Sequence, residues 1–308
     1  MTAVGGRFQG GRREHVLRAR FRRNLKFRIG SALLLLFVSF PLLHRGLHAT
    51  VWASEPSVYH PEVGFDVTIS HPSGPSPRHL LGTDPLGRDV LSMLTVAIGP
   101  SIVVAISTAF MILFLSLLAG AAAAFFGRRV DSLLTQLSGV LVLLPAPIMF
   151  LVIGKGRPDY GVLELGLVYG LFFGLGPGAI VVRSRALSVI QRPFIDAART
   201  AGGSRSYIIT HHLIPHLLPF AATQVLVGVT GAMITEGFIE LLGASENRIG
   251  MGTLVYLALA YWDVLQSAVP WSTLLAGAGA VSLLATAFFL LSVGIQEAVD
   301  PRDQRAER

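Results

Sequence analysis

The amino-acid sequence predicts an all-α integral membrane protein with about six transmembrane helices. Of its 308 residues, 52% are hydrophobic and only 14% are charged, and the mean hydropathy is +0.61. Apolar runs of about 20 residues recur, which is the length that a helix needs to cross the hydrocarbon core of a bilayer. The chain has no cysteine, which excludes disulfides, thiolate metal sites and cysteine nucleophiles.

The first 28 residues are strongly basic. Nine arginines and lysines stand there against Glu14 alone, and the whole chain has a net charge of +7. Because this segment adjoins an apolar run, the positive-inside rule predicts a cytoplasmic segment, 1–28. A nucleic-acid-binding arm is the less favoured alternative. The apolar run 29–43 predicts a first transmembrane helix, 29–47, which is retained because no small-x-small cleavage site follows it.

Residues 48–95 form a polar connection, which we expect on the extracytoplasmic side. Its prolines are spaced too closely for a long helix, and residues 63–69 could form a short strand. At its end, Asp84 is expected to cap the next helix and Pro85 to occupy the first helical position. We expect Arg88 and Asp89 to fix the connection by local hydrogen bonds rather than to contact a substrate. The four histidines of this segment are too scattered to suggest a metal site.

Five further spans are expected within a core of residues 96–296. The run 133–153 contains two prolines, which predict a kink. The run 162–182 has a glycine every four residues, which predicts close helix packing, and Gly176-Pro177-Gly178 within it predicts a bend. Residues 256–271 suit an interfacial or re-entrant helix. The five predicted spans are 98–126, 133–153, 162–182, 221–242 and 272–295.

A polar segment, 183–219, separates the fourth and fifth predicted spans. A short helix is expected to start near Pro193, and Gly202 and Gly203 permit a sharp turn after it. A second helix then opens near Tyr207, and Pro215 bends or ends it. The segment therefore predicts a helix-turn-helix finger at a membrane surface.

Three patches of the sequence resemble one protein family. The finger contains Asp196-Ala197-Ala198 with Gly202 four residues after the second alanine and a later Leu-Ile-Pro ending. This spacing resembles the EAA loop of permease subunits of ABC importers, with Asp in place of Glu. The segment 79–92 and the closing segment 297–302 are similar to C-type permeases of dipeptide and oligopeptide importers. The second patch contains Gly82, Thr83, Asp84, Gly87, Arg88 and Asp89.

The resemblance implies the type I ABC importer fold, with a cytoplasmic coupling helix that docks on an ATPase. It also implies a homologous B-type permease, two cytoplasmic ATPase subunits or domains, an extracytoplasmic substrate-binding protein and di- or oligopeptides as cargo, although relatives carry nickel complexes or glutathione and a few export. The sequence has no phosphate loop, so we expect ATP and magnesium on partner subunits, no cofactor on this chain and no catalytic residue. The residues assigned to coupling are Asp196, Ala197, Ala198, Arg199, Gly202, Gly203, Arg205 and Pro215.

Two interpretations of individual side chains remain open. Arg199 and Arg205 either pair with an acidic rim of the ATPase or face lipid headgroups. Thr223, Gln224 and Thr230 either line the pathway or satisfy neighbouring backbone groups. His211, His212 and His216 are not expected to bind metal, because no further ligand lies nearby.

Ionisable residues near membrane depth raise one alternative function. Glu164, Glu236 and Glu240 could mark an ion path, as in a proton- or ion-coupled secondary transporter or a channel. All three lie near predicted helix ends, where we favour a structural role. Counting spans from a cytoplasmic N-terminus places the finger and the tail 297–308 on the cytoplasmic side of a bacterial inner membrane.

Overall fold

The computed structural model describes residues 24–157, 161–242, 249–261 and 271–299, and all its regular elements are helical. Five helices are long and apolar enough to cross a membrane, and a bent pair makes a sixth candidate. The basic residues 1–23 and the tail beyond 299, on which two predictions rest, lie outside the described residues. The elements are α2 (Leu25–Ala49), α3 (Val90–Phe126), α4 (Arg128–Leu143), α5 (Ala146–Gly156), α6 (Val162–Phe173), η1 (Gly174–Gly178), α7 (Ala179–Val189), α8 (Pro193–Thr200), α9 (Arg205–Tyr207), η2 (Ile208–Leu213), α10 (Ile214–Leu241), α11 (Met251–Ala260) and α13 (Trp271–Val299).

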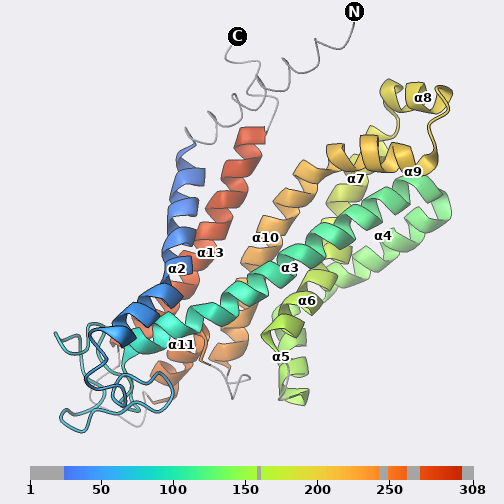
Figure 1. The fold of residues 1–308 in the computed structure, drawn as a ribbon. Coiled ribbons are helices and arrows are strands. Elements are labelled where there is room, and N and C mark those ends of the chain that lie inside the picture. Colours follow the sequence, from blue (N-terminus) through green and yellow to red (C-terminus); the bar gives the residue numbers. More distant parts are fainter. Residues whose placement is uncertain (1–23, 158–160, 243–248, 262–270, 300–308) are drawn as a thin grey trace, which may run out of the picture.

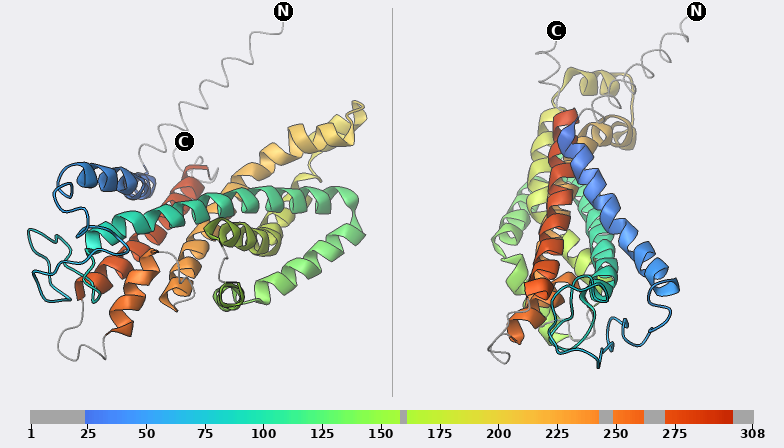
Figure 2. Two further views of the ribbon diagram at one scale, coloured as in Figure 1. Left: turned by 60° about the horizontal axis from the view of Figure 1, so that its bottom comes forward. Right: turned by 90° about the vertical axis from the view of Figure 1, so that its left-hand side faces the viewer.

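The α3 helix is the central element of the bundle (Figure 1). It has 37 residues, which corresponds to a length of about 55 Å, and it packs against α2, α6, α7 and α10. The α2 and α13 helices lie side by side at one edge of the bundle (Figures 1 and 2). They approach closely because Gly30 of α2 faces the backbone of Ala287 and Gly294 of α13 faces the backbone of Phe27.

The glycine repeat of the fourth span packs against α3, as its spacing predicts. A Cβ atom at Gly166 would lie 1.9 Å from the Ser107 hydroxyl, and one at Gly170 would lie 2.6 Å from Cβ of Met111. In addition, the Thr108 hydroxyl donates a hydrogen bond of 3.0 Å to the Gly166 carbonyl. Only glycine allows the two helices to approach this closely.

Two spans are broken, and both breaks lie at predicted proline positions. The pair α4 and α5 bends by 79°, because helix α4 ends before Pro145. The fourth span continues to Val189 rather than ending at 182, and it passes through the π-helical segment η1, where Gly176 leaves the helical region. Ser138 of α4 donates a hydrogen bond of 2.5 Å to the Leu175 carbonyl inside η1, so α4 contacts the break in the fourth span.

Several predicted boundaries are wrong. Helix α2 runs past Pro41 and is longer than the predicted 29–47. The fifth span begins at Arg205, not at 221, because η2 joins α9 to α10 without a stop. The predicted helix 256–271 begins instead at Met251, and residues 262–270 lie outside the described part of the chain.

The predicted strand at 63–69 is also wrong. This segment forms turns, because the Asp66 carboxylate accepts a hydrogen bond from the Thr68 amide at 2.8 Å and curls the backbone locally. The predicted cap at Asp84 is wrong as well, since α3 begins at Val90 with Asp89 as its N-cap. Gly87, at φ 84°, continues the turn beyond Pro85 and delays the helix.

Candidate coupling site

The predicted finger is present as α8 and α9, joined by a tight turn (Figure 1). It projects at the end of the bundle where α2 begins and α13 ends (Figure 1). The connection between α2 and α3 and the helix α11 lie at the opposite end (Figure 1). The two ends of the molecule therefore differ: one carries the finger, and the other carries the α2–α3 connection and α11.

The turn of the finger is a glycine-capped helix end. Gly202 has φ 84° and donates its amide to the Arg199 carbonyl at 3.0 Å, while the Gly203 amide donates to the Ala198 carbonyl at 3.0 Å. This pair of bonds is the Schellman pattern, which needs a left-handed residue where glycine is favoured. A Cβ atom at Gly203 would lie 2.8 Å from the Ala198 carbonyl oxygen, so the two glycines have different roles.

Buried apolar side chains fix the finger to the bundle. Ile195 of α8 is fully buried, as are Leu213 of η2 and Leu217 of α10. Leu213 and Leu217 belong to a cluster with residues of α3 and α7, and Phe194 of α8 packs on its edge. Phe194 of α8 therefore contacts a packed apolar cluster built from α3, α7, η2 and α10, and such a cluster has little room to yield.

The opposite face of α8 is exposed. Asp196 and Ala197 lie in solvent, and Ala198 is half-buried. Asp196 pairs with Arg199 at 3.2 Å, but such an exposed pair contributes only about 0–1 kcal/mol. Thr200 and Arg199 of α8 are exposed too, so the helix presents small and polar side chains, which suits contact with another protein surface.

Aromatic stacking occupies the histidines that follow the turn. The His216 ring stacks on Phe194 with centroids 5.0 Å apart, and the His211 ring stacks on Tyr207 at 4.4 Å. Among the described residues no group of three metal-ligating side chains could hold a metal ion. Pro215 neither ends nor interrupts the helix; it lies at the start of α10, immediately after the π-helical segment.

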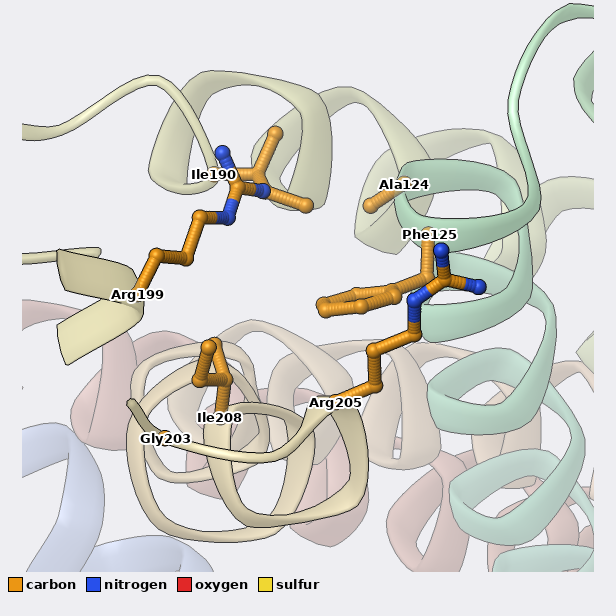
Figure 3. A pocket seen from close by; sticks show the side chains of 7 residues that line it. All are labelled: Ala124, Phe125, Ile190, Arg199, Gly203, Arg205 and Ile208. Carbon is orange, nitrogen blue, oxygen red and sulfur yellow. The ribbon is translucent and has the colours of Figure 1, made fainter. Parts of the chain in front are cut away.

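A cavity of about 340 Å³ lies between the finger and the bundle (Figure 3). Arg199 enters it from α8 and Arg205 from α9, on either side of the turn (Figure 3). Its other walls come from the end of α3 and from the segment after α7. The lining residues are Ala124, Phe125, Ile190, Arg199, Gly203, Arg205 and Ile208.

At the other end of the molecule, the second family-like patch forms a buried polar knot before α3. His79 is 1% exposed, and its Nε2 lies 3.1 Å from an Asp66 carboxylate oxygen while its Nδ1 lies 2.9 Å from one of Asp89. Asp89 also caps α3 by accepting from the Ser92 amide at 2.7 Å. One proton is needed in each of the two histidine contacts, so the three side chains share two protons.

The pKa values of the two carboxyl groups in this knot are shifted in opposite directions. Burial alone raises the pKa of the Asp66 carboxyl, but hydrogen bonds from Thr68 and His79 and the charge of Arg78 hold it well below its ordinary value. Burial raises the pKa of the Asp89 carboxyl, and the hydrogen bonds from His79 and the Ser92 amide only partly offset it.

The remaining motif residues form the turn itself. Asp84 is buried and accepts the Leu86 and Arg88 amides at 2.9 and 2.8 Å, and it pairs with the Arg88 guanidinium at 2.6 Å. The Thr83 hydroxyl lies 2.9 Å from His71 Nδ1, and Gly82, at φ 78°, faces the Ser73 carbonyl. Arg88 and Asp89 thus make local hydrogen bonds, and their structural role in place of substrate contact stays a prediction.

Sequence reasoning missed the pairing of His79 with Asp66. The two residues are separated by 13 positions in an irregular segment, where no helical or strand period relates them. Both side chains are buried, and the sequence does not indicate this, because the prolines and turns between them leave no regular spacing that would predict the contact.

The tentative pathway residues lie along α10. The Thr223 hydroxyl donates to the Phe220 carbonyl at 2.7 Å and the Thr230 hydroxyl donates to the Leu226 carbonyl at 2.9 Å. Both threonines and Gln224 are half-buried. Their place in a pathway stays a prediction.

The carboxylates near helix ends have identifiable neighbours. Glu240 is 6% exposed and accepts the Gly252 amide at 2.8 Å, which ties α10 to the first turn of α11. Glu164 lies 3.7 Å from Arg157 at the start of α6. Glu236 is buried one turn earlier in α10, and the structural role favoured for these carboxylates stays a prediction.

Comparison with known proteins agrees with this architecture. The chain is 28% identical to the dipeptide transport system permease protein DppC of Bacillus subtilis over 240 residues, which are 75% of this chain and 71% of the relative. It is 28% identical to the oligopeptide transport system permease protein OppC of Haemophilus influenzae over 228 residues, 73% of this chain and 71% of the relative. A putative peptide transport system permease protein of Brucella abortus is 29% identical over 287 residues, 92% of this chain and 90% of the relative.

A family profile covers the bundle from the middle of α3 to beyond α13. It is that of the binding-protein-dependent transport system inner membrane component, and it matches residues 112–304. This range includes the finger, the cavity beside it and both broken spans. The chain is a multi-pass membrane protein that belongs to the family of binding-protein-dependent transport system inner membrane components.

Proposed function

We propose that this chain is a permease subunit of an ATP-driven ABC importer of dipeptides or oligopeptides and forms half of its translocation pathway. The family assignment supports the transport class, and the names of the relatives support peptides as the cargo. The observation that carries the proposal is the finger: a short helix with an exposed face, closed by a glycine cap, whose Phe194 packs on the apolar cluster that contains Leu213 and residues of α3, α7 and α10.

The coupling role follows from this geometry. The exposed face of α8, with Asp196, Ala197 and Ala198, docks in a groove of an ATPase subunit, which is the helix-in-groove mode of recognition. Closure of the ATPase subunits on ATP displaces α8, and the buried cluster beneath it passes the displacement to α3, α7 and α10. The spans then move largely as rigid bodies between two arrangements.

Partners complete the transporter. A homologous B-type permease encloses the pathway together with this chain, two ATPase subunits or domains bind at the fingers, and a substrate-binding protein delivers the peptide outside. ATP and magnesium bind to the ATPase subunits, because this sequence has no phosphate loop. We expect this chain to have no ATPase activity of its own, and its finger and both termini to lie in the cytoplasm.

A secondary transporter or channel is the rejected alternative. Its main support was the set of carboxylates near membrane depth. Glu240 holds the first turn of α11, and Glu164 lies near Arg157 at a helix start. The family assignment supports an ATP-driven system instead.

The finger is tested by replacing Gly202 with valine. A β-branched residue at φ 84° costs about 1–3 kcal/mol, and open space surrounds the position, so the strain falls on the turn alone. We expect the Gly202→Val chain to insert in the membrane at the wild-type level. Peptide uptake by cells, and co-purification of the ATPase subunits, should fall about 10-fold or more.

Gly127 provides a matched control. It also has a positive φ, 81°, and open space around it, but it lies between α3 and α4 and outside the finger. Gly127→Val should therefore keep ATPase association and uptake near wild type. Unchanged uptake in Gly202→Val, or an equal loss in both variants, contradicts the coupling role of the finger.

A further inference from the structure

The cavity behind the finger combines apolar walls with two cationic side chains. Phe125 and Ile190 form part of its wall, and Arg199 and Arg205 are its charged lining residues. None of its lining residues within the described chain is acidic. A buried apolar ligand would not need the guanidinium groups, and a free ion would not need the apolar wall, so the lining suits an amphipathic anion.

The orientation of α8 directs Arg199 toward the bundle. Ile195 and Arg199 are four residues apart and therefore lie on the same face of the helix. Ile195 is fully buried against the permease, whereas Asp196 and Ala197 lie on the exposed face. Figure 3 shows the Arg199 guanidinium beside Ile190, and the same guanidinium lies 3.2 Å from the Asp196 carboxylate in an exposed ion pair.

Arg205 approaches the cavity from the other side of the turn. Figure 3 shows its side chain reaching toward the end of α3, near Phe125. Within the described part of the chain it forms no ion pair. Two guanidinium groups held on opposite sides of one cavity can each donate to the oxygens of a single phosphate.

The depth of the cavity identifies the kind of anion. The apolar helix α3 ends at Phe126, one residue after Phe125 of the cavity wall, so the cavity lies at the end of an apolar span. Three further arginines are exposed: Arg129 in the first turn of α4, Arg185 in α7 and Arg192 just before α8. Such a basic surface attracts the anionic lipids of the membrane.

We propose that this cavity binds the phosphate headgroup of an anionic phospholipid through Arg199 and Arg205. The headgroup lies between α8 and the end of α3, with its glycerol against Phe125 and Ile208. It therefore holds the inner face of the finger to the membrane surface while the outer face remains free for the ATPase. This role extends beyond the proposed function, because it requires neither ATP nor peptide.

The test measures lipid retained by the purified full-length chain. The protein in detergent is mixed with phosphatidylglycerol or with phosphatidylethanolamine, and bound lipid is counted by native mass spectrometry. We expect wild type to retain phosphatidylglycerol about 10-fold better than an Arg199→Gln/Arg205→Gln double variant. Arg192→Gln, an exposed arginine that does not line the cavity, should behave as wild type.

Three results overturn the proposal. The first is equal phosphatidylglycerol retention in wild type and the double variant. The second is displacement of the lipid by millimolar inorganic phosphate, which would mean a free-anion site. The third is unchanged lipid retention with loss of ATPase co-purification from phosphatidylethanolamine nanodiscs, which would assign the arginines to an acidic partner surface.

A second variant separates charge from folding. Arg199→Lys/Arg205→Lys keeps both positive charges but cannot form bidentate bonds. Partial recovery of phosphatidylglycerol retention in this variant supports headgroup binding, whereas equal retention of phosphatidylglycerol and phosphatidylethanolamine by the wild type overturns it. Because neither readout involves transport, failure here is distinguishable from failure of the coupling role.

Discussion

At the scale of single residues, the charges of the polar knot before α3 have opposite effects on stability. The folded-state pKa of Asp66 is lowered from its ordinary value of 3.8. The ionised carboxylate therefore adds to the free energy of unfolding above pH 3.8, and this contribution is lost as the pH falls below that value. The folded-state pKa of Asp89 is raised, so its contribution is present at low pH and is lost as the pH rises through that raised value.

The lowered pKa of Asp66 predicts that acid destabilises the connection between α2 and α3. Trp52 is 3% exposed and stacks on Tyr59, so its fluorescence reports the folding of this segment. In a Trp262→Phe/Trp271→Phe background, we expect the denaturant midpoint of the Trp52 signal to fall as the pH drops below 3.8. Asp66→Asn should have a lower midpoint at pH 7 and little further loss over that window.

Asp89→Asn is the control for this titration. Asparagine remains a good N-cap, so α3 keeps its start, and the acid loss caused by Asp66 should persist. An acid dependence that is the same in wild type and Asp66→Asn would show that another group is responsible.

At the scale of elements, the contact between α3 and α6 depends on glycine. A Cβ atom at Gly170 would lie 2.6 Å from Met111 Cβ and 2.9 Å from the Thr108 carbonyl. Gly170→Ala should therefore destabilise the chain by about 1–3 kcal/mol through overpacking. Thermal unfolding in detergent, followed by circular dichroism, measures the loss.

Gly99→Ala is the matched substitution for this contact. Gly99 is also helical, but open space surrounds the position of its Cβ atom. Both substitutions have the same gain in helix propensity, so the difference between them isolates the packing term. Equal unfolding temperatures for the two variants would mean that α3 and α6 accommodate a methyl group at Gly170 without a loss of stability.

The elements also show what the sequence could and could not predict. Runs of apolar residues and prolines located the spans and both breaks, because these features act within a single helix. The continuation of α9 through η2 into α10 was missed, since Pro215 is compatible with a helix start as well as a helix stop. Likewise Asp84 and Asp89 are equally good caps in sequence, and only Gly87, held at positive φ, selects the second.

The candidate site was predictable to the same extent. Local rules gave the α8 helix and the turn at Gly202, because a cap is made within six residues. The cavity was not predictable, since it joins Phe125 to Arg199 and Arg205 across more than 70 positions of the chain. Long-range packing of this kind leaves no periodic signal in the sequence.

At the scale of the whole molecule, the bundle has two distinct ends joined by α3. One end carries the finger, the arginine-lined cavity and the junction of α2 with α13, where Asn24 donates to Glu297 at 2.9 Å. The other carries the polar knot and α11. Helix α3 connects the two ends. Near its C-terminus it packs in the apolar cluster that contains Leu213 and Leu217, and at its N-terminus it is capped by Asp89 of the polar knot.

This polarity predicts which side of the membrane each end faces. Because the chain has no cysteine, a single introduced cysteine can be labelled alone. Val67 in the connection is 83% exposed, and Thr200 of the finger is also exposed. In intact cells, an impermeant maleimide should label Val67→Cys and not Thr200→Cys. Opening the cells should then label Thr200→Cys, while Ala287→Cys, at a fully buried position, stays unlabelled. Labelling of Thr200→Cys in intact cells would place the finger outside, beyond the reach of any cytoplasmic ATPase and of the lipid leaflet proposed to hold it.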